Sequence, residues 1–224
     1  MTRRLLLVHG LHNARWWLVP LAARLRSQGF EPEPFGYASV VGGPERAIPA
    51  LVERLRDAPV DGVVAHSLGG LIALEALRQA PDAAVSRVVC LGSPLRGSRI
   101  ARAVAARAWT RPLLGRSAAL LQAGLARWEG PAALGVVAGD VAQGVGRLFA
   151  RFDGVSDGTV ALEETRLPGL ADHCVVHCSH AGLVWSADAS RQAGHFLRTG
   201  RFLRTTFPLH TPSAPGRSPG AWNT

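Results

Sequence analysis

A serine lies between a predicted strand and a predicted helix in the first third of the sequence. The apolar run Gly62–His66 predicts a buried strand, and Leu71–Leu77 predicts an amphipathic helix. A sharp turn between the two would lift the hydroxyl of Ser67 out of the backbone, where a substrate carbonyl can reach it. The helix N-terminus beneath it offers free N–H groups and a positive dipole end to an oxyanion. These residues predict nucleophilic attack on an acyl carbon.

The residues around the serine are small, as such a turn requires. The segment Ala65-His66-Ser67-Leu68-Gly69 differs from the nucleophile-elbow pattern G-x-S-x-G only at its first position. Ala65 is the smallest residue with a Cβ, so the close approach of helix and strand is nearly preserved. The alternative interpretation is an ordinary strand–loop–helix connection that contains a serine.

Two later segments could activate the serine. A serine hydroxyl is a weak nucleophile and needs a general base, which an acid in turn orients. Asp157 begins the run Asp-Gly-Thr-Val after a loop rich in Gly and Asp, and His180 follows the apolar segment Cys174–Cys178. The chain order nucleophile, acid, histidine occurs in one known arrangement of such triads.

A fourth motif lies near the N-terminus. The run Leu5–Val8 predicts a central strand of a parallel sheet, and His9-Gly10 follows it directly. Together with the serine turn, the Asp-Gly run and the late histidine, this motif resembles the small bacterial lipases and esterases of the α/β-hydrolase family. The resemblance extends from about residue 5 to about residue 202 and is weakest over residues 95–133.

This resemblance implies a role for each residue. Ser67 Oγ would attack the acyl carbon, His180 would take its proton, and Asp157 would hold the imidazole in the useful tautomer. The N–H groups of Leu11 and Leu68 would receive the oxyanion, and such a donor is typically worth about 3 kcal/mol. Water activated by the same histidine would then release the acyl group. No cofactor is implied.

The acid has competitors in the sequence. Asp140, Asp153 and Asp172 also lie between the serine and the histidine. Asp140 directly follows the apolar run Leu134–Gly139, so its position alone makes it a candidate. The acid-loop motif of the family favours Asp157, with Asp153 second. Most loop aspartates are solvated turn residues, which is the alternative for the others.

Histidines and cysteines near the late histidine raise the question of a metal site. His173, Cys174, His177 and Cys178 are close in sequence. On an extended strand the two cysteines would lie roughly 13 Å apart at about 3.3 Å per residue. A zinc ion needs its ligands within about 2.3 Å. We therefore expect no metal.

The alternation of apolar and helical segments predicts the fold class. Strands are expected at Leu5–Val8, Phe30–Tyr37, Gly62–His66, Val85–Gly92, Leu134–Gly139 and Cys174–Cys178. Strands separated by helices favour an α/β fold with a mostly parallel sheet covered on both faces, here the α/β-hydrolase fold. We expect one domain over residues 1–207 and a disordered tail, rich in Pro, Ser and Gly, over residues 208–224.

A helical insertion is expected over residues 96–133. It follows a strand end, on the ligand-binding edge of such a sheet, and is rich in Ala, Leu and Arg. Ile100, Val104 and Ala108 would share one helical face. The insertion would act as a lid over the serine, and a weak contact with an anionic membrane surface is a further expectation. His12, Trp16 and Trp17, beside the first strand end, are candidates for the substrate pocket.

Composition limits the alternatives. The chain has 224 residues, of which 47% are hydrophobic and 18% charged, and its formal net charge is +9. All basic residues are arginine, but they are scattered, and no nucleic-acid-binding motif occurs, so we expect no nucleic acid partner. The three cysteines do not form a disulfide framework. The apolar N-terminal stretch breaks at His9-Gly10, too short for a signal peptide, so we expect a cytoplasmic protein.

The sequence predicts a serine hydrolase that cleaves carboxylic esters through an acyl-enzyme. The substrate would be a small-molecule or lipid-like acyl ester. A thioesterase or acyltransferase with the same triad is an alternative, because one fold hosts many reactions. A binding protein that keeps the fold without the activity is the third interpretation.

Overall fold

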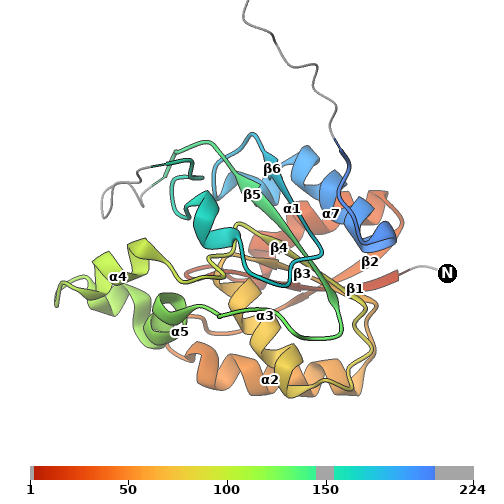
Figure 1. Ribbon diagram of the computed structural model, residues 1–224. Helices are drawn as coiled ribbons and strands as arrows, with labels where there is room; N and C mark the ends of the chain where they lie inside the picture. Colours follow the sequence, from red (N-terminus) through yellow and green to blue (C-terminus); the bar gives the residue numbers. More distant parts are fainter. Residues whose placement is uncertain (1–2, 145–153, 205–224) are drawn as a thin grey trace, which may run out of the picture.

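A six-stranded sheet of parallel strands runs through the centre of the molecule (Figure 1). The computed structural model describes residues 3–144 and 154–204. The strand order is β2-β1-β3-β4-β5-β6. The strands are β1 (Arg3–Val8), β2 (Phe30–Phe35), β3 (Gly62–His66), β4 (Arg87–Leu91), β5 (Ala133–Gly139) and β6 (Asp172–Val176). The predicted α/β class and parallel sheet are confirmed.

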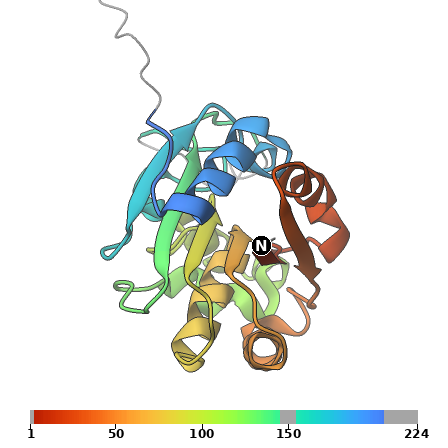
Figure 2. The same ribbon diagram turned by 90° about the vertical axis from the view of Figure 1, so that its right-hand side faces the viewer.

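Helices cover both faces of the sheet (Figure 2). On one face, α2 (Gly43–Asp57) and α3 (Leu68–Gln79) bury their apolar stripes against alternate residues of the central strands. On the other face lie α1 (Val19–Ser27), the short α6 (Gly182–Trp185) and α7 (Ala187–Thr199). A central strand buried on both faces must be apolar throughout, which explains the continuous runs in β1 and β3.

The strand order reverses direction between β1 and β3. From β1 the chain moves outward to β2 and then returns to add β3, β4, β5 and β6 on the other side. At such a switch point the connections leave the carboxyl ends of the two strands in opposite directions and open a crevice. The residues after β1 and β3, including Gly10 and Ser67, therefore meet at one edge of the sheet.

The last helix fixes the end of the sheet that holds His180. The hydroxyl of Ser186 accepts a hydrogen bond from the Ala189 N–H at 3.1 Å and caps α7. Ala189, Ala193, Phe196 and Leu197 are buried against the sheet, as their helical spacing predicts.

The insertion consists of short helices. It contains α4 (Arg99–Ala105), the 3₁₀ helix η2 (Arg111–Ser117) and α5 (Ala118–Ala123). Ile100 and Val104 are buried as expected, but Ala108 is exposed because α4 ends before it. The expected tail over residues 208–224 lies outside the described residues. Within residues 3–144 and 154–204, no helix is long and apolar enough to cross a membrane.

Candidate active site

Ser67 lies on a strained turn between β3 and α3. Its backbone has φ 55° and ψ −125°, a conformation that residues with a Cβ rarely adopt. The turn is held by a hydrogen bond from the Ser67 N–H to the carbonyl of Leu91, at 2.9 Å. Serine often caps a helix with its hydroxyl, but Ser67 makes no such bond to α3. Its hydroxyl is therefore available for another partner.

The small residues after the serine let α3 approach β1 closely. A Cβ on Gly69 would lie 2.5 Å from the carbonyl oxygens of both Val8 and His9. Backbone atoms cannot move away from such a contact cheaply, so this position needs glycine. The glycine of the elbow pattern thus sets the distance between the nucleophile and the end of β1.

Ser67, His180 and Asp157 form a continuous hydrogen-bonded chain. The Nε2 atom of His180 lies 3.0 Å from Ser67 Oγ, and its Nδ1 atom lies 2.7 Å from Asp157 Oδ2. Because a carboxylate only accepts hydrogen bonds, Nδ1 is assigned the proton and Nε2 is left as the acceptor for the serine hydroxyl. Such an imidazole can take the serine proton.

The Asp157 carboxylate is buried and held by its own loop. It is 1% exposed, and its Oδ1 atom accepts hydrogen bonds from the N–H groups of Thr159 and Val160 at 2.9 and 2.7 Å. The Asp157 carbonyl accepts a further bond from the His180 N–H at 2.9 Å. We call residues 154–161 the acid loop. This loop fixes both the Asp157 carboxylate and the backbone of His180, which faces it.

The competing acids are placed elsewhere. Asp140 pairs with the exposed His177, with 2.9 Å between Oδ1 and Nδ1. Asp172 accepts a hydrogen bond from the Phe202 N–H at 2.8 Å and so ties the chain end to β6. Asp153 lies outside the described residues.

The histidines and cysteines of the β6 segment do not gather around one point. His173 Nε2 lies 2.8 Å from the hydroxyl of Thr165, and burial lowers its pKa to about 4. Burial raises the pKa of Cys174 to about 12 and that of Cys178 to about 11, which disfavours the thiolate that a metal binds. The described part of the chain contains no group of three or more His, Cys, Asp or Glu side chains that could hold a metal.

Two backbone N–H groups beside Ser67 are unpaired. Neither Leu11 nor Leu68 has a hydrogen-bond partner for its N–H within the described residues. The chain after β1 passes close to the nucleophile, since a Cβ on Gly10 would lie 2.9 Å from the Cβ of Ser67. Both N–H groups therefore belong to segments that border the serine, and free N–H groups there suit an oxyanion.

A stack of two rings holds the segment of residues 9–11. His9 and Tyr37 lie parallel with 4.2 Å between ring centroids, and the Tyr37 hydroxyl donates to the His9 carbonyl at 2.8 Å. The Nδ1 atom of His9 lies 2.9 Å from the carbonyl of Gly10. Burial lowers the pKa of His9, so the ring is neutral and donates this bond.

A largely apolar cavity of about 470 Å³ opens at Ser67. Ser67 and His180 lie in its wall together with His12 and Trp17, two of the candidate pocket residues. Trp16 does not line it and is 69% exposed. The insertion contributes apolar side chains to the same cavity: Ile100, Ala101, Leu114 and Leu121.

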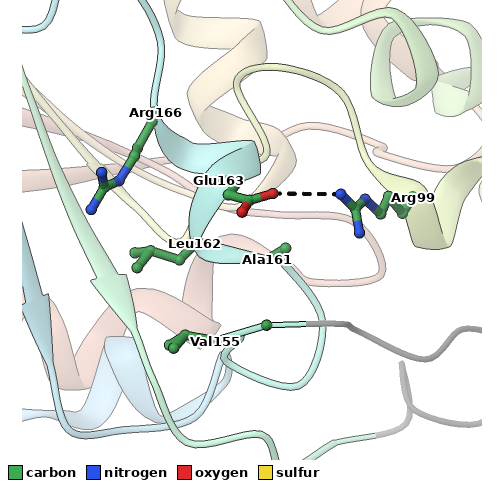
Figure 3. A pocket seen from close by; sticks show the side chains of 7 residues that line it. Arg99, Val155, Ala161, Leu162, Glu163 and Arg166 are labelled. Atoms are coloured by element: carbon green, nitrogen blue, oxygen red, sulfur yellow. Dashed lines mark hydrogen bonds and ion pairs between the residues drawn. The ribbon is translucent and has the colours of Figure 1, made fainter.

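A second cavity, of about 490 Å³, lies between the insertion and the acid loop (Figure 3). An ion pair between Arg99 and Glu163, 3.5 Å apart, crosses this cavity. Arg166 lines the cavity on the side of Glu163 away from Arg99. Its described lining contains no serine, cysteine or histidine. This cavity therefore offers no nucleophile or general base, unlike the one at Ser67.

His66 contacts His180 and lines the cavity at Ser67. Its Nε2 atom lies 3.1 Å from the carbonyl oxygen of His180, and the two rings are 4.8 Å apart. Burial lowers the pKa of His66 to about 3, so the ring is neutral and donates through Nε2. Its position beside Ser67 was the only signal in the sequence, because the two histidines are 114 residues apart.

Glu164 was not predicted from the sequence either. Its buried carboxylate accepts hydrogen bonds from the Arg99 N–H at 2.6 Å and from the Ala161 N–H at 2.9 Å. Burial raises its pKa above the usual range. One side chain thus joins the start of α4 to the acid loop, a link between segments 65 residues apart.

Comparison with known proteins places the fold. No family model matches the sequence, and no curated protein matches it. The mature lipase BlEst2 of Bacillus licheniformis is 20% identical, with a TM-score of 0.67 over 88% of this chain and 91% of that one. Its propeptide form gives a TM-score of 0.71, again at 20% identity, over 98% of this chain and 52% of that chain. The methylesterase MES16 of Arabidopsis is 14% identical, with a TM-score of 0.54 over 88% of this chain and 98% of that one.

These similarities and the parallel sheet show that the chain has the α/β-hydrolase fold. Lipases and esterases are among its structural relatives. At these identities the likeness concerns the fold, and chemistry must be argued from the site.

Proposed function

We propose that this protein is a serine hydrolase that cleaves carboxylic esters through an acyl-enzyme on Ser67. The observation that supports this most directly is the chain of hydrogen bonds from Ser67 Oγ to His180, at 3.0 Å, and from His180 to Asp157, at 2.7 Å. A buried, oriented acid behind an imidazole that faces an uncapped serine hydroxyl is the arrangement that general-base activation of serine needs.

The reaction would proceed in two halves. Ser67 Oγ attacks the ester carbonyl while His180 Nε2 takes the hydroxyl proton, and the Leu11 and Leu68 N–H groups receive the negative oxygen. The imidazolium then gives its proton to the departing alkoxide as the carbon–oxygen bond breaks. In the second half, water gives a proton to the same nitrogen as its oxygen attacks the acyl carbon. The imidazolium then returns the proton to Ser67 Oγ as the bond between the acyl carbon and Oγ breaks, and the carboxylic acid is released. Asp157 stays ionised throughout.

The cavity indicates the kind of acyl group. Leu114, Leu121 and Ile100 give the part of the wall that the insertion contributes an apolar character. A wall of this kind favours an acyl chain without charge, because burial of a charged group there would lack a partner. We therefore place the acyl part of the substrate, small or lipid-like, against the insertion.

The test is the turnover of p-nitrophenyl esters of increasing acyl length, together with labelling by a fluorophosphonate. Wild-type protein should hydrolyse one or more esters and become labelled, and Ser67→Ala should lose both properties. Ser86→Ala is the matched control, because the exposed Ser86 hydroxyl bonds only the Asp61 carbonyl and the same change is made outside the site. Wild-type protein that is inert to both reagents would contradict the proposal and favour a binding protein with this fold.

Competition between esters distinguishes the alternative acyl chemistry. An acyl thioester and the matching oxygen ester, offered together, should be consumed with the oxygen ester preferred. A strong preference for the thioester, or acyl transfer to an added alcohol in place of water, would reassign the protein to the thioesterases or acyltransferases with the same residues.

A further inference from the structure

The turn between α4 and η2 forms the outer end of the insertion. We call residues 106–113 the insertion tip; they lie at the left-hand end of the molecule in Figure 1. Thr110 is buried, whereas the other residues of the tip are exposed. The tip therefore presents most of its side chains outward.

Two large apolar side chains on the tip are left exposed by the part of the chain that the structure describes. Trp109 is 77% exposed and Leu113 is 46% exposed. Leaving a large apolar side chain in water forgoes the favourable free energy of its burial. An indole that is both apolar and able to donate a hydrogen bond suits the boundary between a bilayer and water.

Two arginines flank the tryptophan without a counter-charge. Neither Arg107 nor Arg111 has a hydrogen bond or ion pair at its guanidinium within the described residues. Three other arginines of the insertion form ion pairs, Arg99 with Glu163, Arg116 with Glu45 and Arg127 with Glu129. The tip thus places two cations without a carboxylate partner among the described residues beside its exposed tryptophan.

The sequence around the tip enhances this charge. From residue 83 to residue 128 there is no Asp or Glu, and arginine is the only charged residue type. An excess of positive charge of this kind attracts anionic surfaces, and guanidinium groups bind phosphate oxygens in a bidentate manner.

We propose that the insertion tip docks on the surface of an anionic phospholipid bilayer. Arg107 and Arg111 would contact lipid phosphates, while Trp109 and Leu113 would enter the headgroup region beside them. The apolar pair argues for a bilayer as the occupant, because an RNA or DNA backbone would leave a leucine without a partner.

The tip has a defined shape that can present these side chains. The buried hydroxyl of Thr110 donates to the carbonyl of Val104, at 2.6 Å, and lies 3.2 Å from the carbonyl of Arg107. These bonds close the end of α4 and hold Trp109 on its outer side. The backbone of the turn is thus held before binding, which lowers the entropic cost of docking.

Docking would bring the cavity at Ser67 close to the lipid. Leu113 faces solvent at the tip, and the next residue, Leu114, lines the cavity. A substrate that leaves the bilayer beside the tip would therefore meet the apolar wall of the cavity first. This consequence rests on the proposed function, whereas the docking itself does not.

The first test is co-sedimentation of the full-length protein with phosphatidylcholine vesicles, with and without phosphatidylglycerol. We expect tighter binding to the anionic vesicles, weakened by added salt. The double variant Arg107→Gln/Arg111→Gln should lose about 30-fold in affinity, at about 1 kcal/mol per arginine. The control Arg24→Gln/Arg46→Gln removes the same charge from exposed arginines of α1 and α2 and should lose far less.

The second test concerns the apolar pair. Trp109→Ala should weaken binding about 10-fold, and Trp16→Ala, which removes a tryptophan of similar exposure outside the tip, should not. Brominated lipids should quench the fluorescence of wild-type protein more than that of Trp109→Phe. These measurements need no ester turnover, so they succeed or fail independently of the proposed hydrolase activity.

Three outcomes would overturn the docking proposal. One is equal binding to vesicles with and without phosphatidylglycerol, and another is equal loss of affinity in the two arginine double variants. The third is binding to a DNA duplex that requires Arg107 and Arg111 but tolerates Trp109→Ala, which would assign the tip to a nucleic acid. Circular dichroism of each variant checks that the fold is retained.

Discussion

The strand-end loops around Ser67 and the helical insertion differ in how their polar groups are satisfied. In the loops, the Asp157 carboxylate is buried and accepts three hydrogen bonds, and glycines allow backbone contacts that a Cβ would block. In the insertion, the helices are short, and unpaired arginines and a tryptophan face outward. The loops hold the atoms of the site at fixed distances, whereas the insertion presents exposed side chains to its surroundings.

This difference suggests a division of work. Chemistry that depends on a distance of about 3 Å requires rigid segments. Here the loops at the carboxyl ends of the parallel strands supply them. Selection among substrates and surfaces tolerates variation, and apolar side chains on an insertion can supply it without disturbing the nucleophile. Changes in the loops should therefore have large effects on rate, and changes in the insertion should have smaller effects on preference.

The largest effect is expected for Asp157→Asn. An amide cannot hold the imidazole in the tautomer that accepts the serine proton, so kcat should fall by about 10,000-fold. Ester turnover at neutral pH measures it. The matched controls Asp140→Asn and Asp153→Asn test the competing acids and should stay near wild type; a comparable loss in either would move the acid to that residue.

The next effect is expected for Gly10→Ala. The added Cβ would lie 2.9 Å from the Cβ of Ser67 and must displace the nucleophile or the segment of residues 9–11. Misplacing one oxyanion donor typically costs about 100-fold or more in kcat. Gly154→Ala is the control, because a Cβ there meets no atom of the described residues within 4 Å. Wild-type turnover by Gly10→Ala, in protein that is folded by circular dichroism, would refute the assignment of Leu11 as a donor.

Acidification should destabilise the site through its buried histidine. Burial lowers the pKa of His66 from 6.5 to about 3. Between these two pH values, His66 is protonated in the unfolded chain and neutral in the folded protein. Stability is therefore present above pH 6.5 and lost as the pH falls. The loss from this residue should be about 2 kcal/mol at pH 5.

Urea unfolding at pH 8 and pH 5 measures this loss. His66→Gln should recover about 2 kcal/mol of the difference between the two pH values, because its side chain does not titrate. The lowered pKa values of His9 and His173 act in the same direction, and the raised pKa of Glu164 acts in the opposite one. An unchanged pH dependence in the variant would show that His66 is not buried as a neutral ring.

The smallest effect is expected for Leu114→Ala in the insertion. Removing this side chain enlarges the cavity on its apolar side. The kcat/KM for a long acyl ester, divided by that for a short one, should therefore rise about 5-fold. The ratio is measured on one preparation, so a loss of folded protein cancels. Leu113→Ala is the matched control, because Leu113 faces solvent. Equal ratios in wild type and both variants would show that Leu114 does not determine the preference for acyl length.

Much of this architecture could be predicted because it depends on local pattern. The bounds of β3 agree with the run Gly62–His66, since a strand buried on both faces is apolar throughout. The α7 cap at Ser186 follows from the capping preference of serine, and the buried stripe of α7 follows from helical spacing. The helix α2 was not predicted, although its apolar residues Ile48, Leu51 and Leu55 have that spacing; Pro49 lies within it and weakens the signal.

The rest depends on contacts between distant segments. The order of the motifs in the sequence suggested Ser67, Asp157 and His180, and the structure brings them together. No local pattern shows that Glu164 joins α4 to the acid loop, because a carboxylate in a polar segment is usually solvated. Which of two adjacent tryptophans enters the cavity depends on the exact path of a 3₁₀ turn, which spacing alone does not define.

The positive φ of Ser67 has a consequence for the evolution of the protein. A non-glycine residue held in this conformation costs about 1–3 kcal/mol, and glycine adopts it without strain. A change to glycine at this position would relieve the backbone and remove the hydroxyl at the same time. Selection for stability alone would thus favour glycine here, and under the proposed function the serine is kept against that pressure because its hydroxyl is needed.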